Sequence, residues 1–207
     1  MEKSILYYVH DPMCSWCWGF SSALQELLAA LPGSVSVRRV LGGLAPDSDV
    51  VMPAALQRQI QSGWQRIENT IPGTRFNFDF WKNNLPQRST YPACRAVIAA
   101  RKQGAEYDVA MTRAIQKAYY QQARNPSDDD TLAELAAELN LSVDDFRRDL
   151  NSEETNAILH DELRLAKELY AESFPSLVLK TGQEACTIKI DYLNASVMLE
   201  DIMDKIS

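Results

Sequence analysis

The sequence has no uninterrupted apolar run long enough to cross a bilayer, which takes about 20 predominantly apolar residues. It is also short of positive charge, with 21 lysines and arginines against 28 aspartates and glutamates and a formal net charge of -7. An acidic chain repels the phosphate backbone of a nucleic acid. We therefore expect neither a membrane protein nor a partner of nucleic acid.

Cysteine is scarce, and the four residues are Cys14, Cys17, Cys94 and Cys186. Four cysteines are too few for disulfides to be the main stabilisation of a chain of 207 residues. The N-terminal residues contain no long apolar segment followed by a cleavage site of small residues, so the sequence predicts no secretory leader and a cytoplasmic protein. In a reducing compartment, a close cysteine pair indicates catalysis or metal binding rather than a structural bond.

The composition is that of a globular protein, with 46% hydrophobic and 24% charged residues. Near the N-terminus, Ile5–His10 is apolar and aromatic and predicts a buried strand. A helix is expected from about Cys14 to Ala30, ended by Pro32-Gly33, and Val35–Leu41 predicts a second strand. The order strand, helix, strand favours a βαβ unit with parallel strands.

Strand patterns nearly vanish between residues 50 and 170, where amphipathic helical patterns follow one another. Ser142 and Ser152 are expected to cap two of these helices. Strand patterns return at 176–180 and 185–190, before a last helix near 194–206. We therefore predict an α/β fold in which one domain, residues 1–49 plus 171–207, is interrupted by an all-helical domain at residues 50–170.

The pair Cys14-Ser15-Trp16-Cys17 lies where the first strand gives way to the helix. Unpaired N–H groups at a helix N-terminus stabilise a thiolate there, so Cys14 is the expected nucleophile and the more exposed thiol. Cys17 follows within one helical turn and is close enough to attack a mixed disulfide. The pair therefore predicts a complete thiol–disulfide exchange cycle that needs no cofactor.

Two other interpretations of the pair remain. A structural zinc site needs four ligands, and the remaining soft or imidazole ligands, Cys94, Cys186, His10 and His160, form no second motif. A chance pair of inert buried cysteines is the other interpretation. Redox exchange is favoured over both, and Cys94 and Cys186 are expected to behave as small buried hydrophobes.

The segment Asp11-Pro12-Met13-Cys14-Ser15-Trp16-Cys17-Trp18-Gly19-Phe20 resembles the active-site segment of DsbA-like thiol–disulfide oxidoreductases in the thioredoxin superfamily. It is most similar to their intracellular bacterial branch, the FrnE-like protein-disulfide isomerases. The resemblance covers essentially the whole chain, through the helical insertion to Phe174-Pro175 and the two strands that follow. It implies a thioredoxin-like fold with a large inserted all-helical domain.

The resemblance also implies site residues. Pro175 corresponds to the family's cis-proline, and the backbone of Phe174 would then face Cys14 and pair with an extended substrate. Trp16, between the cysteines, is the expected substrate-contacting aromatic, and Phe20 is expected in the core. His10 and Asp11 either influence the charge at the pair or simply end a strand and start a turn.

The function expected is reduction or isomerisation of protein or small-molecule disulfides, with glutathione as the candidate electron partner and no metal. Because Ser15-Trp16 supplies no cation to the Cys14 thiolate, we expect a couple less oxidising than that of DsbA. One alternative is a glutathione-dependent transferase or isomerase related to the kappa class, although those families generally carry serine where Cys14 stands. Another is a non-catalytic module that binds a metal or a partner.

Overall fold

The computed structural model describes residues 4–206, and its centre is a four-stranded sheet with the order β2-β1-β3-β4. β1 (Ser4–His10) pairs in parallel with β2 (Val35–Leu41) and antiparallel with β3 (Ser176–Thr181). β3 then pairs antiparallel with β4 (Glu184–Ile188). The predicted thioredoxin-like α/β fold is confirmed, with the first strand central and the late strands beside it.

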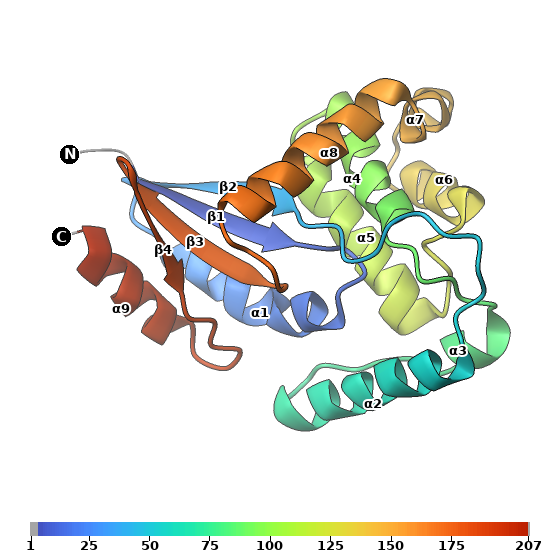
Figure 1. The fold of residues 1–207 in the computed structure, drawn as a ribbon, viewed down its shortest axis with the longest axis horizontal. Helices are drawn as coiled ribbons and strands as arrows, with labels where there is room; N and C mark the ends of the chain where they lie inside the picture. Colours follow the sequence, from blue (N-terminus) through green and yellow to red (C-terminus); the bar gives the residue numbers. More distant parts are fainter. Residues whose placement is uncertain (1–3, 207) are drawn as a thin grey trace.

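The helices, in chain order, are α1 (Ser15–Ala30), α2 (Ala54–Thr70), α3 (Phe80–Asn83), α4 (Tyr91–Gln103), α5 (Tyr107–Gln122), α6 (Asp129–Glu138), α7 (Val143–Leu150), α8 (Glu153–Glu168) and α9 (Ala195–Ile206). Figure 1 shows α4 to α8 gathered at one end of the sheet, with α2 and α3 beneath them. No helix within residues 4–206 is both long and apolar enough to span a membrane.

Apolar side chains on both faces of β1 hold the sheet between two layers. Leu6 and Tyr8 face the cluster that α1 and α9 contribute, whereas Tyr7 and Val9 face the cluster that contains Ala166 of α8. A central strand buried on both sides needs such a continuous apolar run rather than an alternating one. β1 therefore places the residues that follow it, including the cysteine pair, at the centre of the molecule.

Helix α8 takes part in two cores. Leu159, near its start, is buried in the core of the helical layer, and Ala166, near its end, is buried against the sheet. The helical layer and the sheet are thus joined through one continuous helix. Because α8 packs in both cores, the predicted division into a domain of residues 1–49 plus 171–207 and a helical domain of residues 50–170 stays a prediction.

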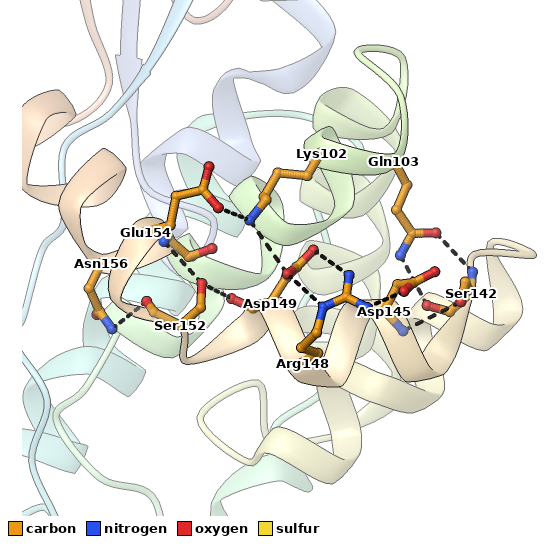
Figure 2. Close-up of polar contacts among 10 residues, drawn as sticks. Lys102, Gln103, Ser142, Asp145, Arg148, Asp149, Ser152, Glu154 and Asn156 are labelled. Atoms are coloured by element: carbon orange, nitrogen blue, oxygen red, sulfur yellow. Dashed lines mark hydrogen bonds and ion pairs between the residues drawn. The ribbon is translucent and has the colours of Figure 1, made fainter.

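The helical layer is tied together by caps and ion pairs (Figure 2). Ser142 caps α7 by accepting a bond from the Asp145 N–H, and Ser152 caps α8 by accepting one from the Thr155 N–H, as the sequence predicts. Lys102, at the end of α4, bridges the two helices through Asp149 and Glu154, at 3.4 and 2.7 Å. These contacts fix the orientation of α4, at whose start Thr90 and Cys94 contact the Asp11 carboxylate.

Candidate active site

Cys14 is the N-cap residue of α1. Its carbonyl accepts the first helical bond, from the Trp18 N–H, and its own N–H donates to the Asp11 carbonyl at 3.0 Å. The Asp11 carboxylate accepts the Met13 N–H at 2.7 Å, which closes the turn between β1 and the helix. No side chain caps the helix and its first turn holds no acidic residue, so the N–H groups of that turn keep their partial positive charge beside Cys14.

The Cys14 sulfur lies 3.3 Å from the carbonyl oxygen of Phe174, and the Phe174–Pro175 bond is cis. Both features match the expectation drawn from the resemblance. The Phe174 ring packs directly over Gly42, where a Cβ atom would stand 2.1 Å from the ring. A glycine at position 42 is therefore required for the loop carrying Phe174 to reach the cysteine.

Cys17 lies one turn into α1 and is 1% exposed, against 6% for Cys14. Burial raises the pKa of the Cys17 thiol well above its usual value, and the hydrogen bond to Cys14 and the charge there raise it further. Both cysteines are free thiols. Burial therefore favours the protonated form of Cys17 in this reduced pair.

The expectation that Cys14 is exposed is wrong. Its sulfur is buried because the loops carrying Leu44 and Phe174 close around the start of α1 and form, with Cys14, the wall of one cavity. The order of the two cysteines is as predicted, since Cys17 is the more buried. A molecule that reaches Cys14 must therefore enter this cavity.

The cavity has a volume of about 430 Å³ and lies between the start of α1, the helix α2 and the loops around residues 87–90 and 172–174. Its charged lining residues are Arg88 and Glu172. Helix α2 turns Ile60 and Gly63 toward it, and Gly63 leaves open space, because a Cβ atom there would meet nothing within 4 Å. Cavities of this size hold small ligands or single side chains of a peptide.

Trp16 also lines the cavity, but it is only half-exposed. Its ring packs against Tyr192, with centroids 5.1 Å apart, and the Arg66 guanidinium lies 5.2 Å from its ring centroid. The uncovered part of the ring faces the cavity, and the substrate contact expected of Trp16 stays a prediction. Phe20 is fully buried, as expected for a core residue.

Asp11, whose role the sequence left open, is fully buried beneath the pair. Besides Met13, its carboxylate accepts the Leu44 N–H and the Thr90 hydroxyl, both at 2.6 Å. Burial raises the pKa of Asp11, and these bonds oppose the shift. Asp11 thus joins the loop after β1, the loop after β2 and the start of α4 at one point.

His10 is buried and stacks on Tyr8, with centroids 4.8 Å apart. Neither ring nitrogen has a hydrogen-bond partner among the described residues. Burial, together with the charges of Arg39 and Arg101, holds the pKa of His10 well below its usual value. The imidazole is therefore neutral at physiological pH and supplies no positive charge to Cys14.

The other two cysteines lie outside the pair Cys14 and Cys17. Cys94 is fully buried in α4, with its sulfur 3.7 Å from the Asp11 carboxylate, and Cys186 is half-buried on β4. Within residues 4–206, no three side chains of the metal-binding types gather into a site. Thr90, Arg88 and the face of α2 could not be assigned to the site from the sequence, since no motif marks them and they lie far from Cys14 in the chain.

Comparison with known proteins gives consistent matches. A Nitrosomonas europaea protein proposed to be a protein disulfide isomerase superposes with a TM-score of 0.84 and 26% identity, over 99% of this chain and 97% of that one. The cytosolic disulfide reductase DsbM of Pseudomonas aeruginosa superposes with a TM-score of 0.76 and 25% identity, over 98% of each chain. A second structure of DsbM contains glutathione.

Curated relatives are more distant. The ClpXP adapter protein SpxH of Halalkalibacterium halodurans is 24% identical over 177 residues, which are 84% of this chain and 57% of that protein. The chain spans 56% to 61% of the length of the curated relatives it matches. These matches relate the chain to SpxH proteins at the level of sequence.

The sequence profile described as Thioredoxin matches residues 7–200, which include both cysteines and the cis-proline loop. The match spans nearly the whole chain and agrees with the superpositions on disulfide oxidoreductases. The chain therefore belongs to the Thioredoxin family, and its fold is that of the DsbA-like oxidoreductases.

Proposed function

We propose that this protein is a thiol–disulfide oxidoreductase that reduces or isomerises protein or small-molecule disulfides in the cytosol. One observation carries the proposal: the Cys14 sulfur lies at an uncapped helix N-terminus, 3.3 Å from the Phe174 carbonyl, in the wall of a cavity of about 430 Å³. A nucleophile, a stabilising dipole and a backbone edge for the substrate thus meet at one place.

The exchange proceeds in two steps. The Cys14 thiolate attacks one sulfur of the substrate disulfide, so that a bond forms between Cys14 and the substrate, and the other substrate sulfur leaves as a thiolate and takes up a proton. Cys17 then loses its proton and attacks the Cys14 sulfur, which releases the second substrate thiolate. Two electrons pass to the substrate, and the protein is left with a Cys14–Cys17 disulfide.

A thiol must return these two electrons, and we propose glutathione for this role. The cavity beside Cys14 carries Arg88, which can pair with a carboxylate of a small acidic thiol, and Glu172, which can pair with its amine. The related protein DsbM has a structure with glutathione, which supports the same assignment here. Two glutathione molecules would reduce the Cys14–Cys17 disulfide and become one glutathione disulfide.

The working direction we propose is reduction. Ser15 and Trp16 supply no cation to Cys14, and His10 is held neutral, so the reduced form is less stabilised than in a strongly oxidising couple. A less stabilised reduced form means a potential below that of DsbA, which is about -120 mV. Equilibration in glutathione buffers measures the potential, and a value near that of DsbA would contradict the direction.

Reduction of insulin disulfides by the purified protein with glutathione tests the proposal. We expect turnover with the unsubstituted protein and none with Cys14→Ser. Cys17→Ser should instead accumulate a mixed disulfide at Cys14, which mass spectrometry detects. Cys186→Ser serves as the matched control, because Cys186 lies on β4, outside the pair and outside the cavity, and activity that persisted in Cys14→Ser would refute the mechanism.

A second candidate function is that of a protein-binding adapter. Three large apolar residues are exposed on the loops beside the cavity: Val50, Val51 and Leu85. A contiguous patch of such groups would mark a protein contact, and the SpxH relatives are named as adapters. An adapter would keep its partner when Cys14 is replaced by serine, whereas an oxidoreductase loses turnover.

A further inference from the structure

A second, smaller cavity lies behind Cys17. Its volume is about 130 Å³, enough for several water molecules. Six of its lining residues matter here: Tyr8, Cys17, Ser21, Arg39, Thr112 and Gln116. It shares no lining residue with the cavity that contains Cys14, so the two sulfurs of the pair open on different spaces.

Tyr8 of β1 lines this cavity together with Cys17. Burial and the nearby charge of Cys17 raise the pKa of Tyr8 well above its usual value, and a hydrogen bond to Cys17 adds to the effect. Tyr8 therefore keeps its proton and can donate it in a hydrogen bond to the Cys17 sulfur. The Arg39 guanidinium lies 5.2 Å from the Tyr8 ring centroid and adds positive charge on the same side.

The exchange cycle creates a need for such a space. Cys17 must lose a proton before it attacks the mixed disulfide, yet its sulfur is buried and does not line the substrate cavity. During this step the substrate itself occupies the Cys14 side. The Asp11 carboxylate is a poor acceptor for the proton, because Met13, Leu44 and Thr90 already donate to it.

Building on the proposed function, we propose that Cys17 releases its proton to solvent through the cavity behind it, and that Tyr8 is the positioning residue whose hydroxyl donates to the Cys17 thiolate as it forms. The proton passes to water in the cavity. The Cys17 thiolate then attacks the Cys14 sulfur, the bond between Cys14 and the substrate breaks, and the substrate leaves as a thiolate. No further oxidant or reductant takes part.

The titratable and charged groups facing Cys17 come from every element packed around it: Tyr8, Asp11, Cys14, Arg39, Arg113, Tyr120 and Tyr192. In the reduced pair the charges of Cys14 and Asp11 disfavour a thiolate on Cys17, but once Cys14 is bonded to the substrate only the charge of Asp11 remains. The two arginines lie on the cavity side and act in the opposite sense. The positive charge on the cavity side, where Tyr8 lies, therefore favours loss of the proton from Cys17.

The two steps can be timed separately with one equivalent of 5,5′-dithiobis(2-nitrobenzoate), whose thiol product absorbs visible light. In a Cys186→Ala background, attack by Cys14 releases the first product and attack by Cys17 releases the second. Tyr8→Phe should leave the first phase unchanged and slow the second about tenfold near neutral pH, with its pH midpoint moved upward by about one unit. Ser21→Leu, which fills the cavity, should also slow the second phase alone.

Tyr7→Phe is the matched control, because Tyr7 is the neighbouring tyrosine on β1 and faces the opposite side of the sheet. It should leave both phases unchanged. The proton route would be overturned by equal slowing of the second phase in Tyr7→Phe and Tyr8→Phe, or by an unchanged second phase in Tyr8→Phe. In either case a normal first phase would still support the exchange function. Absence of the first phase in the unsubstituted protein would overturn the function and the route together.

Discussion

The Cys14 sulfur and the Phe174 carbonyl oxygen lie 3.3 Å apart although 160 residues separate them in the chain. Pairing between β1 and β3, in which Val9 stands opposite Ser176, brings the two loops together. The cysteine motif is thus only half of the site. The other half is the loop that carries Phe174 and Pro175, which follows the helical layer in the chain.

The two cysteines of the pair should differ in reactivity. We expect iodoacetamide at mildly acidic pH to alkylate Cys14 well before Cys17, because burial raises the pKa of Cys17 and keeps it a thiol. Peptide mapping after short reaction times gives the order. Labelling of Cys17 first would refute the assignment of nucleophile and resolving thiol. Cys186, which is half-buried on β4, provides an internal reference.

The stability of the protein should fall as the pH is lowered from 6.5. The pKa of His10 is held well below its usual value in the folded protein, so the unfolded chain binds a proton that the folded chain does not. The contribution of the neutral His10 to the free energy of unfolding is therefore fully present above pH 6.5. Below pH 6.5 the free energy of unfolding falls by up to about 1.4 kcal/mol per pH unit. Urea unfolding at pH 7.5, 6.5 and 5.5 measures the loss.

Replacing His10 by phenylalanine should remove this part of the pH dependence. The substitution keeps the stacking on Tyr8, and neither ring nitrogen has a partner to lose among the described residues. His160, the other histidine of the sequence, is exposed, and His160→Asn is the control that should retain the wild-type slope. An unchanged slope in His10→Phe would contradict the buried, neutral imidazole.

The hydroxyl of Thr90 should contribute measurably to stability. It donates to the Asp11 carboxylate at 2.6 Å and accepts the Ala45 N–H at 3.1 Å, both in buried surroundings. Thr90→Val keeps the shape but leaves these groups unpaired, so we expect a loss of about 1–3 kcal/mol in the free energy of unfolding. Thr90→Ser restores the hydroxyl and should recover most of it, and an equal loss in both variants would point to packing instead.

Gly63 offers a way to separate stability from substrate access. Because it lies inside α2 with open space around it, Gly63→Ala should raise the free energy of unfolding by about 0.5–1 kcal/mol. Gly63→Phe should project into the cavity and lower kcat/KM for insulin about tenfold, or about 1.4 kcal/mol. Its reaction with a small aromatic disulfide should change little, and an equal fall for both substrates would contradict a blocking effect.

Much of this protein follows from local patterns in its sequence. The strand before Cys14, the helix from Ser15 to Ala30 and the serine caps of α7 and α8 were predictable, since each depends on neighbours within a few residues. The order of the cysteines at a helix start also predicts which of them attacks and which resolves, and those roles stay a prediction. For these features, spacing along the chain already determines which groups meet.

Other features were decided by the tertiary structure alone. The sequence suggested that Cys14 is exposed, but loops from distant parts of the chain bury it. The sequence left the roles of Asp11 and His10 open. Only the folded structure shows that the Asp11 carboxylate accepts hydrogen bonds from Leu44 and Thr90, and that the His10 imidazole is buried. The space behind Cys17 likewise arises where α1, α5 and the sheet meet. Burial and charge depend on groups far apart in sequence, and folding alone determines which of them become neighbours.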